Sequence, residues 1–251
     1  MPPDPSRLLA VAGIDLPLVG FYDAPDPAPF APLREPEKGE CLFATYPDWL
    51  AGRTLHLTAD RFGCGGAGYW LFGKEGRSRE EFVRFLVEGE GLKESPESMN
   101  DWIDRTPPYR PEHGHLLFGP LREDMAAHLR TITFFVNPDQ LSLLLIGAQY
   151  HHRPGEPDPA AVPFGSGCME IGVLLGDPEA PRAVVGATDI AMRSHLPPDI
   201  LAFTVTRPMF ERLCRLGESS FLYKPFWRNL RRARSLGDPP GTGETAAAGD
   251  S

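Results

Sequence analysis

Two cysteines in this sequence, Cys64 and Cys168, are flanked by glycines and are followed by similar segments. In both segments a glycine stands four residues after the cysteine, and bulky apolar residues follow it. In the first turn of a helix, a cysteine has its thiolate stabilised by unpaired N–H groups and by the helix dipole, which lowers its pKa. The pattern therefore predicts a catalytic nucleophile, a thiolate ligand of a metal or an anion-binding turn at each cysteine. The alternative is that both are small buried residues.

Glycines beside these cysteines are candidate contacts of a cofactor or ligand, because a residue without a side chain lets another group approach the backbone. The candidates for such cofactor binding are Gly63, Gly65, Gly66, Gly68 and Gly167.

The segment 63–68 also fits the G-x-G-x-x-G pattern of dinucleotide-binding proteins. That pattern requires a hydrophobic strand that leads directly into it and an acidic residue at the end of the next strand. Here residues 59–61 (Ala-Asp-Arg) interrupt the strand, and the acidic residues Glu88 and Glu90 close a helix. A flavin or nicotinamide oxidoreductase is therefore the third-ranked alternative.

The surrounding elements are those of a protein with both helices and strands. Residues 77–88 show apolar residues at helical spacing, and residues 131–136 predict a strand. Asn137 and Gln140 then have the spacing of a capping box, which predicts the start of the next helix.

A weak internal repeat connects the two cysteines. Residues 135–138 and 204–208 each predict a strand end, an N-cap residue and a proline in the first turn of a helix. The order of cysteine helix, strand, strand and helix thus recurs in residues 40–150 and 160–217. Chance agreement of common supersecondary units is the alternative. A genuine duplication would bring both cysteines to one cleft.

These elements predict an α+β fold in a single domain that covers residues 1–236. Residues 237–251 contain too few apolar side chains to offset the entropy of ordering, so a disordered tail is expected there.

Composition restricts the class of protein. The chain has 251 residues and a formal net charge of −9, which argues against binding to nucleic acid or to an anionic membrane. It shows no signal peptide, and no apolar run approaches the roughly 20 residues of a membrane span. We expect a cytoplasmic protein with reduced cysteines and with a small-molecule ligand as its partner. The oligomeric state is not indicated.

The order of these motifs resembles the domain of unknown function 169 family of uncharacterised bacterial and archaeal proteins. The resemblance covers residues 5–217 and depends on Cys41, Cys64, Cys168, the Gly119-Pro120-Leu121 turn and residues 135–140. A further cysteine of that family is replaced here by Ala187. The resemblance implies no established activity. Without that further cysteine, the resemblance implies a thiolate cluster of at most Cys41, Cys64 and Cys168. Three thiolates are adequate for an iron–sulfur or zinc site with an open position.

The leading hypothesis is therefore a small-molecule or metal-centre site between two repeats, with Cys64 and Cys168 as nucleophile or ligands. The second is a non-catalytic ligand-binding or regulatory module in which the cysteines only pack. The sequence predicts no reaction.

Overall fold

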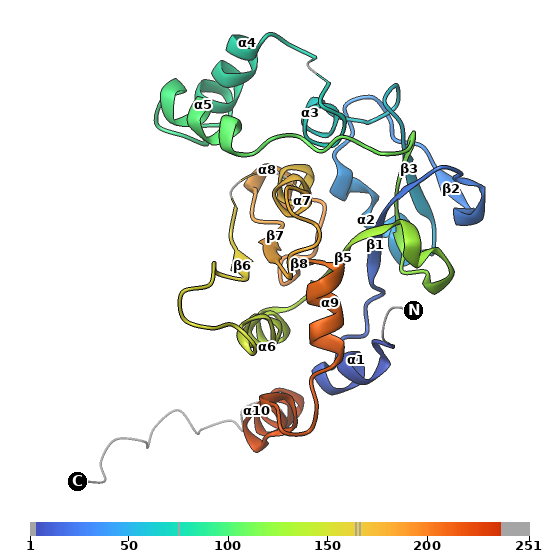
Figure 1. Ribbon diagram of the computed structural model, residues 1–251, viewed down its shortest axis with the longest axis vertical. Helices are drawn as coiled ribbons and strands as arrows, with labels where there is room; N and C mark the ends of the chain where they lie inside the picture. Colours follow the sequence, from blue (N-terminus) through green and yellow to red (C-terminus); the bar gives the residue numbers. More distant parts are fainter. Residues whose placement is uncertain (1–3, 75, 164, 166, 237–251) are drawn as a thin grey trace. The chain divides into compact units, whose positions relative to one another are not determined.

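The computed structural model describes residues 4–74, 76–163, 165 and 167–236. The chain forms two compact units, one that ends at Arg215 and one that begins at Leu216. The strands of the sheet all belong to the first unit (Figure 1). The predicted α+β class is confirmed, whereas the predicted tail 237–251 lies outside the described residues.

One mixed sheet of eight strands runs through the first unit in the order β2-β3-β4-β1-β5-β8-β7-β6. The pairs at the two edges, β2–β3 and β6–β7, are parallel, and the pairs between them are antiparallel. The strands are β1 (Val19–Ala24), β2 (Leu33–Arg34), β3 (Thr54–Leu57), β4 (His115–Pro120), β5 (Leu129–Val136), β6 (Ala160–Ala161), β7 (Ala183–Gly186) and β8 (Leu201–Thr206).

The strand order is symmetric about the β1–β5 pair, but its symmetry differs from the predicted repeat. β4, β3 and β2 follow β1 outward, as β8, β7 and β6 follow β5. By position, the β2–β3 connection with Cys41 matches the β6–β7 connection with Cys168, while Cys64 follows β3. The duplication predicted from sequence, which paired Cys64 with Cys168, is not confirmed. The two strand–helix units it equated begin with β5 and β8, which are adjacent in the sheet.

The helices of the first unit begin and end at recognisable signals. The predicted capping box opens α6: Asn137 Oδ1 accepts from the Gln140 N–H at 2.9 Å, and Gln140 Oε1 accepts from the Asn137 N–H at 3.0 Å. The helices are α1 (Ser6–Ala12), α2 (Tyr46–Leu50), α3 (Gly65–Phe72), α4 (Arg79–Arg84), α5 (Pro96–Arg105), α6 (Pro138–Gln149), α7 (Gly167–Leu175), α8 (Ile190–Arg193) and α9 (Arg207–Cys214).

Shorter helical turns complete this unit. The predicted helix over 77–88 is α4 followed by a π-helical turn, η3 (Phe85–Gly89), and Ser78 and Glu81 form a capping box at its start. The 3-10 helices are η1 (Ala28–Phe30), η2 (Leu42–Thr45) and η4 (Glu123–His128).

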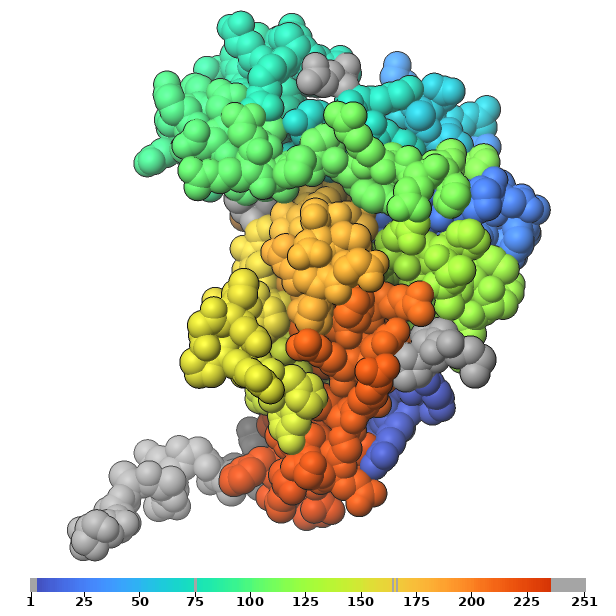
Figure 2. Space-filling view, viewed as in Figure 1, coloured from blue at the N-terminus to red at the C-terminus, as the bar shows by residue number. Residues whose placement is uncertain are grey.

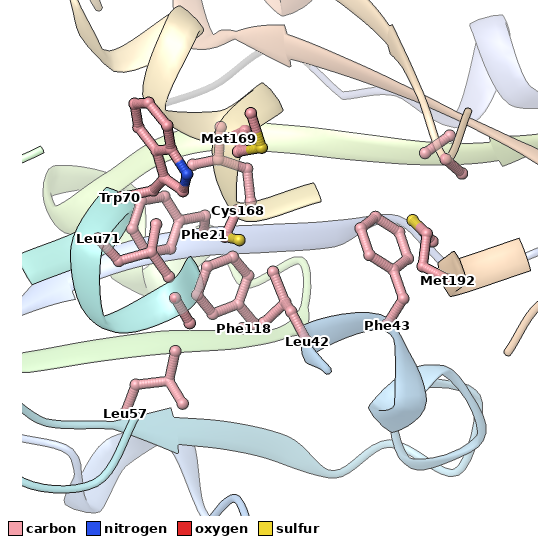
Figure 3. Packing of buried hydrophobic residues seen from close by; sticks show 14 of the residues in the cluster. Phe21, Leu42, Phe43, Leu57, Trp70, Leu71, Phe118, Cys168, Met169 and Met192 are labelled. Atoms are coloured by element: carbon pink, nitrogen blue, oxygen red, sulfur yellow. The ribbon is translucent and has the colours of Figure 1, made fainter. Parts of the chain in front are cut away.

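The core beneath the cysteines is aromatic and aliphatic. Trp70 and Leu71 of α3 are buried with Cys168 of α7, and Phe21 and Phe118 extend from the sheet toward them (Figure 3). The rings of Phe21 and Phe118 stack with centroids 4.3 Å apart. Burial of one Leu or Phe side chain stabilises the folded state by about 1.5–3 kcal/mol. This cluster therefore fixes α3 and α7 against the sheet.

The second unit contains the 3-10 helix η5 (Phe221–Tyr223) and the helix α10 (Pro225–Leu236), whose exposed side chains include several arginines. In the described part of the chain, no helix combines the length and the apolar character needed to cross a bilayer.

Candidate functional site

Cys64 is the N-cap residue of α3. Its backbone is extended, with φ −83° and ψ 164°, as is typical of an N-cap residue. A hydrogen bond with the Cys168 side chain lowers the pKa of Cys64 and is the largest single effect on it. Burial raises this pKa, and the N–H groups of Ala67 and Gly66 lower it further. Together they lower the pKa of Cys64 to about 6. The thiolate therefore predominates at neutral pH.

Cys168 reaches Cys64 because α7 packs closely on α3. Gly172 of α7 faces Trp70 of α3: a Cβ atom built on Gly172 would lie 3.8 Å from the backbone oxygen of Trp70, at van der Waals distance. Cys168 lies in the first turn of α7, is 2% exposed and has its sulfur among core side chains (Figure 3). The structure thus brings together the two cysteines singled out from the sequence, although no disulfide joins them.

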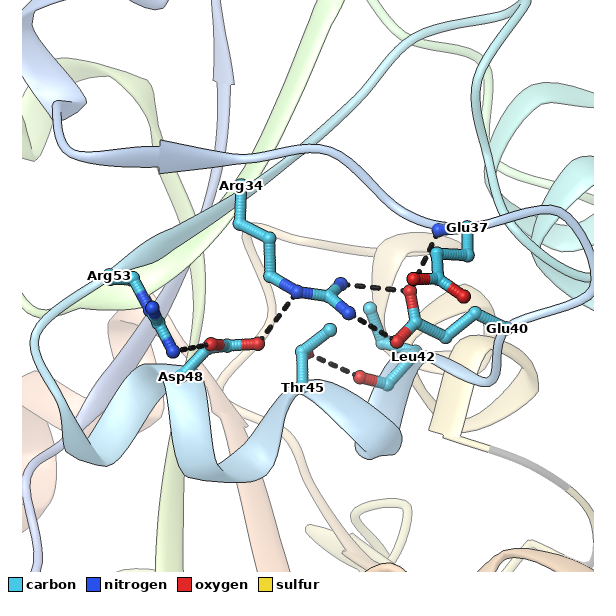
Figure 4. Close-up of polar contacts among 7 residues, drawn as sticks. All are labelled: Arg34, Glu37, Glu40, Leu42, Thr45, Asp48 and Arg53. Atoms are coloured by element: carbon cyan, nitrogen blue, oxygen red, sulfur yellow. Dashed lines mark hydrogen bonds and ion pairs between the residues drawn. The ribbon is translucent and has the colours of Figure 1, made fainter.

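Cys41 is the third cysteine at this site and is positioned by ion pairs. It is the N-cap residue of η2 and lines the same cavity as Cys64. Arg34 Nη1 donates to Glu40 Oε2 at 2.8 Å, and Arg34 Nε lies 2.8 Å from Asp48 Oδ2, which holds the segment before Cys41 against α2 (Figure 4). Burial raises the pKa of Cys41, and the charge of Cys64 raises it further. Cys41 is therefore a neutral thiol beside a thiolate.

A cavity of about 380 Å³ lies beside Cys64. It is bounded by α3, by the α4–η3 segment and by the starts of α7 and α8. In Figure 2 the residues of α4 and α5 form a block next to the surface of α7. Sites for small organic molecules have volumes of about 300–1,000 Å³. The apolar lining residues are Tyr69, Trp70, Phe82, Phe85, Leu86, Leu92, Met169, Ala191 and Met192.

Charged side chains of both signs also line the cavity. The Arg77 guanidinium lies over the Phe85 ring, 4.8 Å from its centroid. Burial raises the pKa of Glu90, and the charges of Asp189 and Cys64 raise it further, so these three acidic groups lie near one another. The charged lining residues are Lys74, Arg77, Arg79, Glu90 and Asp189.

Glu170 is a buried acid on α7 that the sequence did not single out. Its Oε2 accepts a hydrogen bond from the Ala187 N–H at 3.2 Å, whereas its Oε1 has no hydrogen-bond partner among the described residues. Burial raises the pKa of Glu170 to about 8. Ala187 has a φ of +61°, and Asp189 follows as the N-cap of α8. Glu170 therefore supports the turn that brings Asp189 to the cavity.

In the sequence Glu90 closes a predicted helix, and both Glu90 and Asp189 are far from Cys64 along the chain. Glu90 and Asp189 lie near Cys64 because the folded chain brings their three segments together. For Glu170 a signal existed: it is the one acidic residue in the otherwise apolar run 168–175. A charged residue there requires either a partner or a shifted pKa.

Two of the candidate glycines belong to the cavity. Gly65 and Gly66 line it, and a Cβ atom on Gly65 would meet nothing within 4 Å. The space above this turn of α3 is therefore open.

The other three candidate glycines have structural roles. Gly63 has a φ of +76°, which favours glycine. A Cβ atom on Gly68 would lie 2.6 Å from the Phe62 ring, and one on Gly167 would overlap the Phe43 ring. Packing is a sufficient reason for glycine at these positions.

The connection that contains residues 63–68 differs from a dinucleotide-binding unit. It leads from β3 to β4, which are antiparallel neighbours. The dinucleotide-binding βαβ unit joins parallel strands. The flavin or nicotinamide alternative gains no support from this topology.

A metal centre is not supported either. Within residues 4–74, 76–163, 165 and 167–236, no group of three or more His, Cys, Asp or Glu side chains is arranged to hold a metal ion. The set Cys41, Cys64 and Cys168, predicted to bind iron–sulfur or zinc, is therefore not arranged as metal ligands. Instead, two of the three side chains, Cys64 and Cys168, are hydrogen-bonded to each other.

Comparison with known proteins agrees with the resemblance seen in the sequence. No curated protein and no solved structure matches the chain. The model of the DUF169 family, described as "Uncharacterised ArCR", matches residues 19–215, which include the whole sheet and the three cysteines of the site. The chain belongs to the DUF169 family.

Proposed function

We propose that the chain binds a small organic molecule in the cavity beside α3 and that Cys64 reacts with it as a nucleophile. One observation carries this proposal: Cys64 lies in the wall of a mainly apolar cavity of about 380 Å³ and is hydrogen-bonded by a second cysteine. A thiolate is the reactive form of cysteine, and a cavity of this size holds an organic molecule next to it.

The neighbouring groups have complementary roles in this proposal. Cys168 keeps the thiolate charge on Cys64 by hydrogen bonding, and the N–H groups of Gly66 and Ala67 do the same. Gly65 lines the cavity beside Cys64, and a Cβ atom on it would meet nothing within 4 Å, so its position leaves open space next to the cysteine. The apolar lining would hold the body of the ligand.

The test is the pH dependence of Cys64 alkylation by iodoacetamide in the full chain, followed by mass spectrometry of peptides. We expect a midpoint near pH 6 at Cys64, since the thiolate is the reacting species. Cys64→Ser removes this phase, while Cys214 in the same sample serves as an internal control. A Cys64 thiol with the midpoint of a free cysteine, about pH 8.5, or one that does not react at all, would support a non-catalytic module with packed cysteines.

A further inference from the structure

We propose that Cys64 and Cys168 form a two-cysteine redox centre that exchanges electrons with a small organic disulfide bound in the cavity. This inference depends on the proposed function, because it requires Cys64 to react with a molecule in the cavity. It adds the class of substrate and the role of the second cysteine.

The two thiols differ in access, and this difference assigns their roles. Cys64 is half-buried and lines the cavity, so an incoming molecule meets this sulfur first. Cys168 is 2% exposed and belongs to the buried core cluster, against which Cys64 packs. The packing of α3 on α7 and the side-chain hydrogen bond from Cys168 that lowers the pKa of Cys64 both place the two cysteines next to each other. A thiol in that position can attack a disulfide formed on its neighbour. Cys64 is therefore the attacking and Cys168 the resolving cysteine.

The elements that carry the thiols hold them in this arrangement. Each cysteine is at the start of its helix, and the two helices pack against each other through Gly172 and Trp70. Residues of the core cluster surround both helices. The pair is thus formed at the starts of two helices that are packed into the core.

The reaction balances without any further reactant. The Cys64 thiolate attacks one sulfur of the substrate R–S–S–R, its bond to the second sulfur breaks, and RS⁻ leaves. Cys168 then transfers its proton to the departing thiolate or to solvent and attacks the Cys64 sulfur, which expels the second RS⁻. Two protein thiols have been oxidised to one disulfide, and the substrate disulfide has been reduced to two thiols. The reverse sequence oxidises two small thiols.

The cavity favours an organic disulfide with an aromatic or apolar body. Tyr69, Trp70 and Phe82 line the same cavity as Cys64, and Met169 and Met192 add soft apolar side chains to its wall. Its volume exceeds what a small inorganic oxidant would require. We expect an aromatic disulfide to react about 10-fold faster than the polar disulfide of glutathione, which corresponds to about 1.4 kcal/mol of selective contact.

The experiment uses 2,2′-dithiodipyridine as the probe and measures the pyridine-2-thione that is released. The full chain carries Cys41→Ser and Cys214→Ser, which leaves only Cys64 and Cys168 as thiols. We expect two equivalents of thione per chain, no retained adduct and a mass lower by two hydrogens. With Cys168→Ser added, one equivalent is released and a pyridyl disulfide remains on Cys64. With Cys64→Ser added instead, release is at least about 10-fold slower, because the remaining thiol is buried.

Two outcomes separate failure of the inference from failure of the proposed function. One equivalent of thione with a lasting adduct on Cys64 in the two-thiol chain overturns the redox pair but leaves Cys64 as a nucleophile. No release within the time that a free thiol needs overturns both. If the serine substitutions impair folding, the unaltered chain is treated with the same probe. A peptide that joins Cys64 to Cys168 supports the inference, and separate pyridyl adducts on both cysteines overturn it.

Discussion

A half-buried cysteine lies at an end of each of two helices, and the pKa values of these two thiols are shifted in opposite directions. Cys64 precedes the eight residues of α3, and Cys214 is the last of the eight residues of α9. The pKa of Cys64 is lowered to about 6, whereas the pKa of Cys214 is raised to about 12. Similar burial therefore produces a thiolate at one helix end and an inert thiol at the other.

The difference lies in what surrounds each sulfur. Burial raises the pKa of both thiols. At Cys64 a hydrogen bond with Cys168 and backbone N–H groups outweigh burial. At Cys214 the charges of Asp4 and Glu211 add to the effect of burial. A helix N-terminus favours negative charge and a C-terminus disfavours it, so position in the helix acts in the same direction as the local partners.

The largest expected effect is the contrast in reactivity between these two cysteines. At pH 7 the thiolate fraction is about 0.9 for Cys64 and about 10⁻⁵ for Cys214, given the two pKa values. The lower intrinsic nucleophilicity of a low-pKa thiolate offsets part of this ratio. We expect Cys64 to react about 100-fold faster with methyl methanethiosulfonate, as followed by peptide mass spectrometry. Equal rates at the two sites would contradict the comparison.

The second effect isolates the hydrogen bond from Cys168. Cys168→Ala removes the donor, and a hydrogen bond to a charged group is worth about 1.5–3 kcal/mol. We therefore expect the pKa of Cys64 to rise by about one to two units, measured by the ultraviolet absorbance of the thiolate during titration. Cys168→Ser is the matched control, because its hydroxyl can still donate and should retain more of the shift. If alanine and serine leave the titration of Cys64 unchanged, the helix end alone sets its pKa.

The third and smallest effect concerns Glu170, where burial raises the pKa more than the backbone hydrogen bonds lower it. Its pKa is about 8 in the folded chain, above the ordinary value of 4.5 for a Glu carboxyl. Between these values the folded state binds a proton that the unfolded state has released, so the free energy of unfolding falls as pH rises from about 4.5 to 8.

Glu170→Gln removes this titration and keeps the shape of the side chain. Relative to the unaltered chain, the variant should gain about 1 kcal/mol or more in unfolding free energy between pH 5 and pH 8. Urea unfolding at the two pH values measures this difference. Glu90→Gln, at a more exposed acid, serves as the control and should change the pH dependence less. A constant difference for Glu170→Gln would show that its carboxyl titrates normally.

Local sequence patterns predicted individual elements well. The Asn137–Gln140 capping box opens α6, and the glycine-flanked cysteines stand at the starts of α3 and α7. These features depend on hydrogen bonds between residues three or four positions apart, so the signal is contained in a short segment. The helix predicted over 77–88 was also found, except that its end is π-helical.

Relations between distant segments could not be predicted in the same way. The predicted repeat equated the units that begin with β5 and β8, yet these strands are neighbours, and the symmetry of the sheet pairs the Cys41 segment with the Cys168 segment. Strand pairing is set by the packing of the whole sheet, which no short motif encodes. Whether three cysteines direct their sulfurs at one ion likewise depends on tertiary packing, and the described residues contain no group of three or more side chains arranged to hold one.

By itself, the sequence determined that this chain is an α+β protein with cysteines at the starts of two helices. It did so because caps, glycines and apolar periodicity act over a few residues. Only the tertiary structure decided which cysteine is charged, because the pKa of Cys64 depends on Cys168, a residue of another helix. It also decided that Cys64 lines a cavity and that Cys168 does not share its exposure. Burial and distant hydrogen-bond partners exist only after the chain has packed, and these two quantities set the chemistry of the thiols.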